Sequence, residues 1–140
     1  MADPLHMIKL CVGADRVEDL TDWQAARFGD GVAEHVTRMW PKRAAELLAG
    51  GSLYWVFKGV VLARQPIVGL RERIGADGIN RCAIQLDPNV IRTEAQPRRP
   101  FQGWRYLAAA DAPRDLAPGR DREDPLPRDL MAALSEIGLR

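Results

Sequence analysis

The chain has 140 residues, of which 46% are hydrophobic and 28% are charged. This length accommodates one domain with a sizeable core, and this balance is typical of a soluble globular protein rather than a disordered or membrane-embedded one. The net charge is only +1, but residues 33–105 carry twelve Lys and Arg against six Asp and Glu, which gives +6. A basic middle between acidic ends points to a polyanionic partner.

The sequence contains no predicted membrane span or targeting segment. The longest apolar-leaning run, residues 53–63, includes Lys58 and is far shorter than the roughly 20 residues that cross a bilayer. The N-terminus lacks the charged start and cleavage site of a signal peptide. We therefore expect a cytoplasmic protein with no membrane partner. In that compartment Cys11 and Cys82, each in an apolar strand-like context, are expected to be reduced and buried.

The first third of the chain predicts one strand and then helices. Residues 6–13 indicate a strand that ends at Gly13. The next stretch predicts a helix capped by Asp15 and ended by Gly29. Residues 32–51 also predict helical structure, with a break near Trp40 and a new helix from Pro41 to Ala49, because proline is tolerated in a first helical turn but not inside a helix.

From Ser52 onward the pattern changes to strands. Residues 52–72 are rich in β-branched and aromatic side chains, with a turn or bulge expected at Gly59 and interruptions at Pro66 and Gly69. Residues 79–88 alternate between apolar and polar side chains, and residues 89–95 and 101–110 add two more strands. This order predicts an α+β fold with a curved, mainly antiparallel sheet or a small barrel.

The domain is expected to span residues 1–116. Residues 117–140, rich in proline and alternating charge, predict a tail that carries a short C-terminal amphipathic helix.

The start of the helix predicted from Pro41 is one candidate binding site. Unpaired backbone N–H groups favour an anion there, and Arg38, Lys42 and Arg43 add positive charge, which together suit a phosphate. The alternative is a solvated basic turn in which Lys42 or Arg43 pairs with Glu46 along the helix.

The stretch RRPFQGWRYL, residues 98–107, is the second candidate because it interleaves three arginines with three aromatic residues. Guanidinium and aromatic planes both stack on flat ligands such as nucleobases. With other basic and aromatic residues of the predicted strands it suggests a nucleic-acid-binding surface. The residues proposed for this surface are Tyr54, Lys58, Arg64, Arg71, Arg98, Arg99, Trp104, Arg105 and Tyr106. The alternative is an edge strand whose rings point into the core, and core packing is expected to take at least two of Trp55, Phe57, Phe101 and Trp104.

The sequence gives weaker evidence for catalysis than for binding. His35 and Glu72 are candidate proton carriers, but no nucleophile is evident and no catalytic residue is assigned. The two cysteines and two histidines lack the spacing of metal ligands, so neither a metal nor a cofactor is expected.

Four blocks in this order, PKRAAELLAGGSLYWVFKG, ARQPIVGLRE, CAIQLDP and PFQGWRYL, resemble a bacterial family known only as a domain of unknown function. The order of elements is more loosely similar to PUA-like and ASCH-type domains, although KGVVLAR lacks the glutamate of the ASCH-type signature. The looser resemblance implies a PUA-like barrel that binds RNA or modified bases.

These observations favour an RNA- or nucleotide-binding module that uses a basic, aromatic-containing sheet surface. Two alternatives stay open: a small hydrolase or nucleotide-processing enzyme, and a protein-interaction module. The sequence leaves the oligomeric state open.

Overall fold

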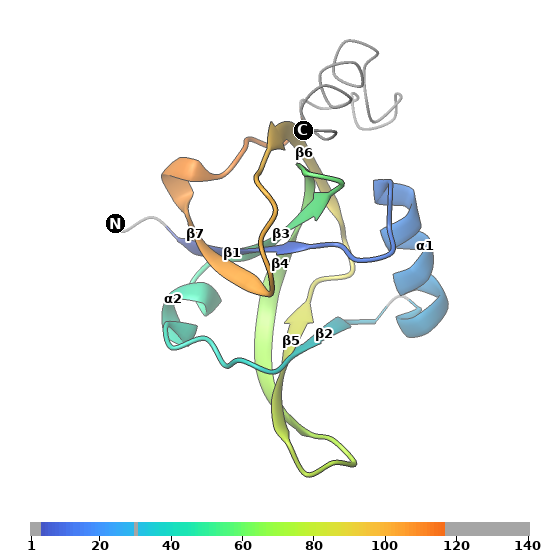
Figure 1. The fold of residues 1–140 in the computed structure, drawn as a ribbon, viewed down its shortest axis with the longest axis vertical. Helices are drawn as coiled ribbons and strands as arrows, with labels where there is room; N and C mark the ends of the chain where they lie inside the picture. The colour runs from blue at the N-terminus through green and yellow to red at the C-terminus, as the bar shows by residue number, and fades with distance from the viewer. Residues whose placement is uncertain (1–3, 30, 117–140) are drawn as a thin grey trace.

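A computed structural model describes residues 4–29 and 31–116, which form an α+β fold as predicted (Figure 1). The elements in chain order are β1 (Leu5–Leu10), α1 (Val17–Phe28), β2 (Ala33–Thr37), α2 (Ala44–Leu48), β3 (Ser52–Phe57), β4 (Val60–Ile74), β5 (Asn80–Leu86), β6 (Ile91–Pro97), β7 (Trp104–Ala108) and the 3₁₀ turn η1 (Ala109–Asp111). The tail predicted over residues 117–140 lies outside the described residues. Within the described part of the chain, no helix is long and apolar enough to cross a membrane.

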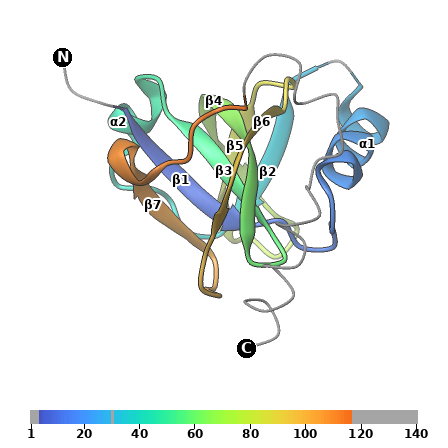
Figure 2. The same ribbon diagram turned by 90° about the horizontal axis from the view of Figure 1, so that it is seen from above.

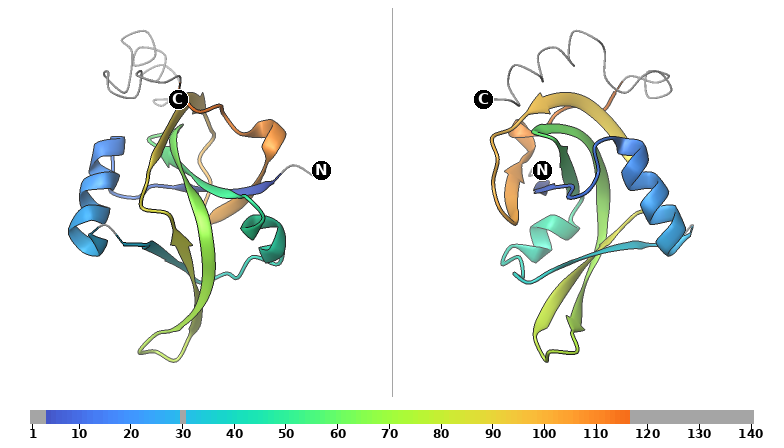
Figure 3. Two further views of the ribbon diagram at one scale, coloured as in Figure 1. Left: turned by 180° about the vertical axis from the view of Figure 1, so that it is seen from behind. Right: turned by 45° about the vertical axis from the view of Figure 1, so that its right-hand side comes forward.

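The strands form one seven-stranded sheet in the order β2-β5-β4-β3-β1-β7, with β6 also pairing with β4. β1 and β3 run parallel, whereas the other described strand pairs are antiparallel, which confirms the mainly antiparallel prediction. The sheet curls strongly (Figures 1 and 3), and the buried residues Val17 and Leu20 of α1 and Leu47 of α2 belong to the same core cluster. It is an open sheet, with β2 and β7 at the two ends of the strand order.

Residues 33–37 form strand β2, so the prediction of a helix over this stretch was wrong. The register of β2 on β5 places His35 opposite Ile84 and Val36 opposite Ala83. The side chains of Ala33 and His35 face the core, whereas Val36, which follows His35, is exposed. Pairing with β5 therefore imposes a period of two on a stretch whose sequence suits either structure. The helix expected from Pro41 to Ala49 is also shorter than predicted, since α2 spans only Ala44–Leu48.

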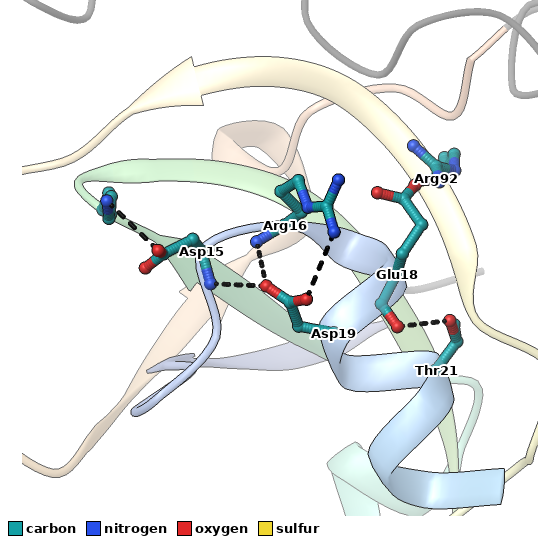
Figure 4. Close-up of polar contacts among 7 residues, drawn as sticks. Asp15, Arg16, Glu18, Asp19, Thr21 and Arg92 are labelled. Atoms are coloured by element: carbon teal, nitrogen blue, oxygen red, sulfur yellow. Dashed lines mark hydrogen bonds and ion pairs between the residues drawn. The ribbon is translucent and has the colours of Figure 1, made fainter.

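The start of helix α1 is stabilised by a carboxylate that accepts hydrogen bonds from the backbone just before the helix. Asp19 Oδ2 accepts hydrogen bonds from the backbone N–H groups of Asp15 and Arg16, each at 3.0 Å (Figure 4). The N-cap is Arg16, one residue later than the Asp15 cap that the sequence predicted. Gly29, with φ of 63°, ends the helix as predicted. Arg92 on β6 pairs with Glu18, which fixes the first turn of α1 to the sheet (Figure 4).

Two hairpins shape the long strand β4. Lys58 and Gly59, with φ of 48° and 83°, form the tight turn between β3 and β4, which confirms the turn expected at Gly59. β4 runs through Pro66 and Gly69, where the sequence predicted interruptions, but its register on β5 shifts between Ile67 and Gly69, which marks a bulge. Beyond the bulge the hairpin of β4 and β5 projects from the body of the molecule (Figures 1 and 3).

The central strands are buried on both faces, and all six residues of β3 are buried. The larger core cluster contains Leu53, Trp55 and Phe57 on one face of β3. Tyr54 and Val56 point to the opposite face and belong to a smaller cluster, against which Phe101 and Ala112 pack from the C-terminal part of the described chain. β1 crosses the molecule between β3 and β7, as the view from above shows (Figure 2). The residues Phe101 and Ala112, which lie before and after β7, therefore cover this face of the sheet.

Both cysteines are free. Cys82 is completely buried, as predicted, whereas Cys11 at the end of β1 is only half-buried. Burial raises the pKa of the Cys11 thiol to about 12.

Candidate nucleic-acid interface

A groove of ≈440 Å³ lies where the end of β6 leads through residues 98–103 into β7. We call it the β6–β7 groove. Its lining residues are Ile8, Pro97, Arg98, Arg99, Pro100, Phe101, Arg105, Tyr106 and Leu107. All three arginines of the stretch that the sequence singled out are among them, and no Asp or Glu is. The groove is therefore positively charged.

Two of these arginines are held by uncharged oxygen atoms. Arg98 donates to the Gln96 side-chain oxygen at 2.9 and 3.1 Å and to the backbone carbonyl of Asp111 at 3.1 Å. Arg105 donates to the backbone carbonyl of Gln102 at 2.9 Å. These bonds orient the guanidinium groups but leave their charge available to an anion, because the acceptors are neutral.

The third arginine, Arg99, is exposed and has no ion-pair partner among the described residues. Arg99 thus adds a mobile charge beside two oriented ones, since its long side chain is not held by the bonds that fix Arg98 and Arg105.

Several other arginines of the described chain are neutralised by carboxylates. Arg64 forms two hydrogen bonds with the carboxylate of Asp115, at 2.8 and 2.9 Å, and donates to Ser52 Oγ at 2.8 Å. This pair holds the segment after η1 against β4 and lowers the pKa of Asp115. Arg64, which the sequence placed on the binding surface, is thus occupied by a contact within the protein.

The aromatic residues of β7 do not share a face with the arginine between them. Side chains alternate along a strand, so Trp104 and Tyr106 lie together, with ring centroids 4.9 Å apart, on the side of the larger core cluster. Arg105, paired in register with Ile8, faces the other side. Because side chains alternate along a strand, the sequence could have shown that Arg105 points to the opposite face from Trp104 and Tyr106.

Of the three rings proposed for stacking, Trp104 and Tyr54 are buried and do not line the groove, whereas Tyr106 is half-buried and lines it. Trp104 is 7% exposed, and its Nε1–H donates to the backbone carbonyl of Met39 at 3.2 Å. Tyr54 is 4% exposed within the smaller core cluster. The hydroxyl oxygen of Tyr106 accepts a hydrogen bond from the Arg43 backbone N–H at 3.0 Å. Sequence reasoning placed these rings on the ligand side, and burial places Trp104 and Tyr54 in the core.

Phe101 is a second aromatic ring at the groove, and the sequence analysis named it only among four rings of which at least two were expected in the core. It is half-buried, packs against the smaller core cluster and lines the β6–β7 groove. The Arg105 guanidinium carbon lies 5.8 Å from the centroid of the Phe101 ring, within the range of a cation–π contact. Positive charge and an aromatic surface are thus adjacent in the groove, and Phe101 rather than Trp104 or Tyr54 provides the aromatic surface.

The predicted phosphate-binding residues lie elsewhere, around α2. α2 has only five residues, and its N-cap residue Arg43 pairs through its guanidinium with Glu46, at 2.6 and 2.7 Å. This is the ion pair that the alternative interpretation of the sequence predicted. Arg38 and Lys42 are exposed, and neither lines the groove.

Lys58 and Arg71 are also separate from the groove. Lys58, in the turn between β3 and β4, pairs with Asp15 at 3.3 Å, next to the start of α1. Arg71 is exposed on the projecting hairpin of β4 and β5. The sheet surface predicted from the sequence is therefore divided, and only Arg98, Arg99, Arg105 and Tyr106 of the proposed residues border one hollow.

The two candidate proton carriers have different environments. His35 points inward, with its ring edge-to-face against Trp55 at 5.4 Å between centroids, and burial lowers its pKa to about 4. Glu72 is exposed on the projecting hairpin. Among the described residues, no group of His, Cys, Asp and Glu side chains is arranged to hold a metal ion.

Comparison with known proteins gives one match. Residues 7–140 match the model of a family described as "Protein of unknown function (DUF1489)". The chain belongs to this family. No curated protein and no solved structure matches the chain. The match confirms the predicted membership in an uncharacterised family, whose description gives no activity.

Proposed function

We propose that the protein binds single-stranded RNA or a nucleotide at the β6–β7 groove. The observation that carries the proposal is a hollow lined by an aromatic ring and by three arginines that have no carboxylate partner among the described residues. In this proposal Arg98 and Arg105 hold phosphate oxygens in fixed positions, and Arg99 contacts a neighbouring phosphate. Phe101 provides the apolar surface for a base.

The groove is small for a duplex and suited to a single strand. Its volume of ≈440 Å³ falls within the range of small-molecule sites, which are roughly 300–1,000 Å³. A single strand exposes base faces and phosphates together, whereas a duplex hides the base faces. We therefore propose recognition of one or two nucleotides of a strand rather than of a helix.

The PUA-like interpretation also remains a proposal. The late aromatic strand β7, following a helix and a curved mainly antiparallel sheet, is the feature that supports it. Fold alone does not establish function. We propose that the binding takes place in the cytoplasm of a bacterium, where RNA and nucleotides are abundant.

The test measures binding of a fluorescently labelled oligouridylate by anisotropy, at salt concentrations from about 50 to 300 mM. The variant Arg98→Gln/Arg99→Gln/Arg105→Gln removes the groove's charge. Each lost phosphate contact with a single strand is expected to reduce the log–log salt slope by about 0.7, so the slope falls by about 2 in total. Arg81→Gln is the matched control, since Arg81 is paired with Asp77 at 2.8 Å on the projecting hairpin.

A second variant tests the ring. Phe101→Leu keeps an apolar side chain against the core but removes the aromatic face, and it is expected to weaken binding by about 1–3 kcal/mol without changing the salt slope. Unfolding in urea checks that both variants keep their stability. The proposal fails if the wild type binds neither the oligouridylate nor uridine 5′-monophosphate, or if the triple variant behaves like Arg81→Gln.

Turnover of either ligand by the wild type would favour the nucleotide-processing enzyme instead. Absence of all nucleic-acid binding would favour the protein-interaction module. The exposed apolar residues Val36, Met39 and Trp40, which follow one another along and after β2, give that alternative a surface.

A further inference from the structure

Three buried polar side chains and an arginine lie together on one face of the sheet. His6 comes from β1, Ser52 and Tyr54 come from β3, and Arg64 comes from β4. His6, Ser52 and Tyr54 are 7%, 0% and 4% exposed. Tyr54 is opposite Arg64 in the register of β3 on β4, and its ring lies edge-on to the His6 ring, with 5.0 Å between centroids. We call these four residues the polar cluster.

Hydrogen bonds within the polar cluster orient the guanidinium group of Arg64. Arg64 Nη1–H donates to Ser52 Oγ at 2.8 Å, and the Ser52 backbone N–H donates to His6 Nδ1 at 2.9 Å. The pKa of His6 is lowered by burial and, to a smaller extent, by the positive charge of Arg64. The cluster therefore holds a cation whose Nε and Nη2 atoms are left to donate to an acceptor outside the cluster.

The acceptor in that position is Asp115. Its carboxylate oxygens accept hydrogen bonds from Arg64 Nε at 2.8 Å and from Arg64 Nη2 at 2.9 Å, which is the paired geometry that an arginine makes with a carboxylate. Asp115 belongs to residues 112–116, which we call the strap, and none of these residues is buried. The side chain of Asp115 is 45% exposed and that of Arg64 is 22% exposed. The cation is thus part of the sheet, whereas the anion comes from an exposed segment.

The backbone of the strap is held by bonds that do not involve the Asp115 side chain. The Arg114 carbonyl accepts a hydrogen bond from the Glu94 N–H at 2.7 Å, and the Leu116 N–H donates to the Arg92 carbonyl at 3.0 Å. The Asp115 side chain can therefore turn outward while the strap stays on β6. A partly exposed ion pair contributes little to stability, so an external anion can replace this carboxylate.

We propose that the polar cluster is a binding site for the carboxylate group of a small carboxylic acid, and that the Asp115 side chain occupies this site as an internal competitor. The external carboxylate accepts the two N–H groups of Arg64 that Asp115 accepts in the structure, and Ser52 keeps the guanidinium in place. None of the residues involved lines the β6–β7 groove, so this inference is independent of the proposed function.

The test follows the Arg64 Nε–Hε signal by ¹H–¹⁵N NMR, with acetate and succinate as probes and sodium chloride holding the ionic strength constant. Asp115→Ala removes the internal competitor and is expected to shift this signal. Either carboxylate is then expected to return the signal toward its wild-type position, and the response is expected to saturate. Asp115→Asn, which keeps the shape of the side chain and removes its charge, replaces Asp115→Ala if that variant does not fold.

The wild type is expected to bind succinate more weakly than Asp115→Ala, because Asp115 competes for the site. If the site is open in about one tenth of the molecules, the apparent dissociation constant is about tenfold higher. Asp111→Ala is the matched control, since Asp111 is exposed, precedes the strap and forms no ion pair with the other described residues, and it is expected to bind as the wild type does. Arg64→Gln/Asp115→Ala is expected to give no saturable response at the Ser52 backbone amide.

The inference is overturned if neither carboxylate moves the Arg64 signal of Asp115→Ala, or if the double variant still responds. Equal affinity of the wild type and Asp115→Ala also overturns it, because the ligand then does not compete with Asp115. A wild type that shows no response at roughly a hundred times the dissociation constant of Asp115→Ala overturns it as well, since the ion pair then excludes the ligand. Loss of oligouridylate binding in the groove variants tests the proposed function and leaves these results unchanged.

Discussion

His35 is expected to make the free energy of unfolding depend on pH between 6.5 and about 4. A single substitution at this position should remove that part of the pH dependence. Its Nε2 is buried without a hydrogen-bond partner among the described residues, and its ring lies edge-on to Trp55. Burial lowers the pKa of His35 to about 4, with the charge of Lys9 as a smaller cause. The folded protein therefore keeps this imidazole neutral down to a pH at which an unfolded chain has already protonated it.

The direction of the effect follows from proton binding. Between pH 6.5 and about 4 the unfolded chain binds one proton more at His35 than the folded protein does. The free energy of unfolding therefore falls as the pH is lowered through this window. At about 1.4 kcal/mol per pH unit, the total loss is roughly 3 kcal/mol, an upper value because part of the ring is exposed.

His35→Phe removes the titrating group and keeps a flat ring against Trp55. Urea unfolding at intervals from pH 7 to pH 4 is expected to show a shallower pH dependence for the variant than for the wild type. At pH 7 the variant is expected to be at least as stable, because the unpaired Nε2 is gone.

His6 is the control for this comparison. Burial, and to a smaller extent the charge of Arg64, also lowers its pKa, so His6 keeps a pH dependence of its own in the His35→Phe variant. Asp19, Glu46 and Asp115 have lowered pKa values, and their contributions are lost mainly below pH 4. An unchanged slope between pH 6.5 and 4 in His35→Phe would refute the assignment to His35.

Three further predictions concern the fold. Cys82 is buried and the pKa of Cys11 is raised to about 12, so thiol labelling at pH 8 is expected to be slow in the native protein and complete in urea; rapid native labelling would contradict this. Gly51→Ala is expected to destabilise by ~2–4 kcal/mol in urea unfolding, because the added Cβ would lie 2.2 Å from the Leu5 carbonyl oxygen and 2.5 Å from that of Leu47, and a stable variant would refute this reasoning. Trp104→Ala is expected to lose about 3–5 kcal/mol of stability, as buried aromatics do. At a temperature where it remains folded, this variant should retain the salt slope of oligouridylate binding.

The sequence predicts best those elements whose pattern has only one interpretation. In β5 the residues Cys82, Ile84 and Leu86 alternate with Arg81, Ala83 and Gln85, which predicts a strand. Cys82, Ile84 and Leu86 are all buried, as is Ala83 on the opposite face. Gly29 and Gly59 were also predicted correctly, because each position has a positive φ that favours glycine.

β2 could not be predicted in this way. Ala33, His35 and Val36 suit either a helix or a strand, since the stretch is short and its polar residues are evenly spread. What decides is the edge of β5, which lies almost fifty residues later in the chain. Local propensity cannot contain that information.

The sequence predicts that the arginines of the groove lie close together, but not which aromatic ring lies beside them. The three arginines of the groove come from eight consecutive residues, so their proximity follows from the sequence itself. That Phe101 rather than Trp104 borders the groove depends on how residues 98–103 turn before β7 begins. That turn is fixed by packing against the smaller core cluster, which gathers residues from β1, β3, β4 and β7.

The positive charge counted along the middle of the chain is larger than the positive charge that the folded protein offers to a ligand. The basic middle owes several of its positive charges to arginines that bind carboxylates within the protein, among them Arg43, Arg64, Arg73 and Arg81. Those charges cancel locally and add little attraction for a polyanion beyond the Debye length. Within residues 4–29 and 31–116, the charges of Arg98, Arg99 and Arg105 are not cancelled in this way, because the acceptors that orient Arg98 and Arg105 are neutral. A polyanion attracted by the basic middle should therefore bind where these arginines gather, and replacing a carboxylate-paired arginine should hardly change its affinity.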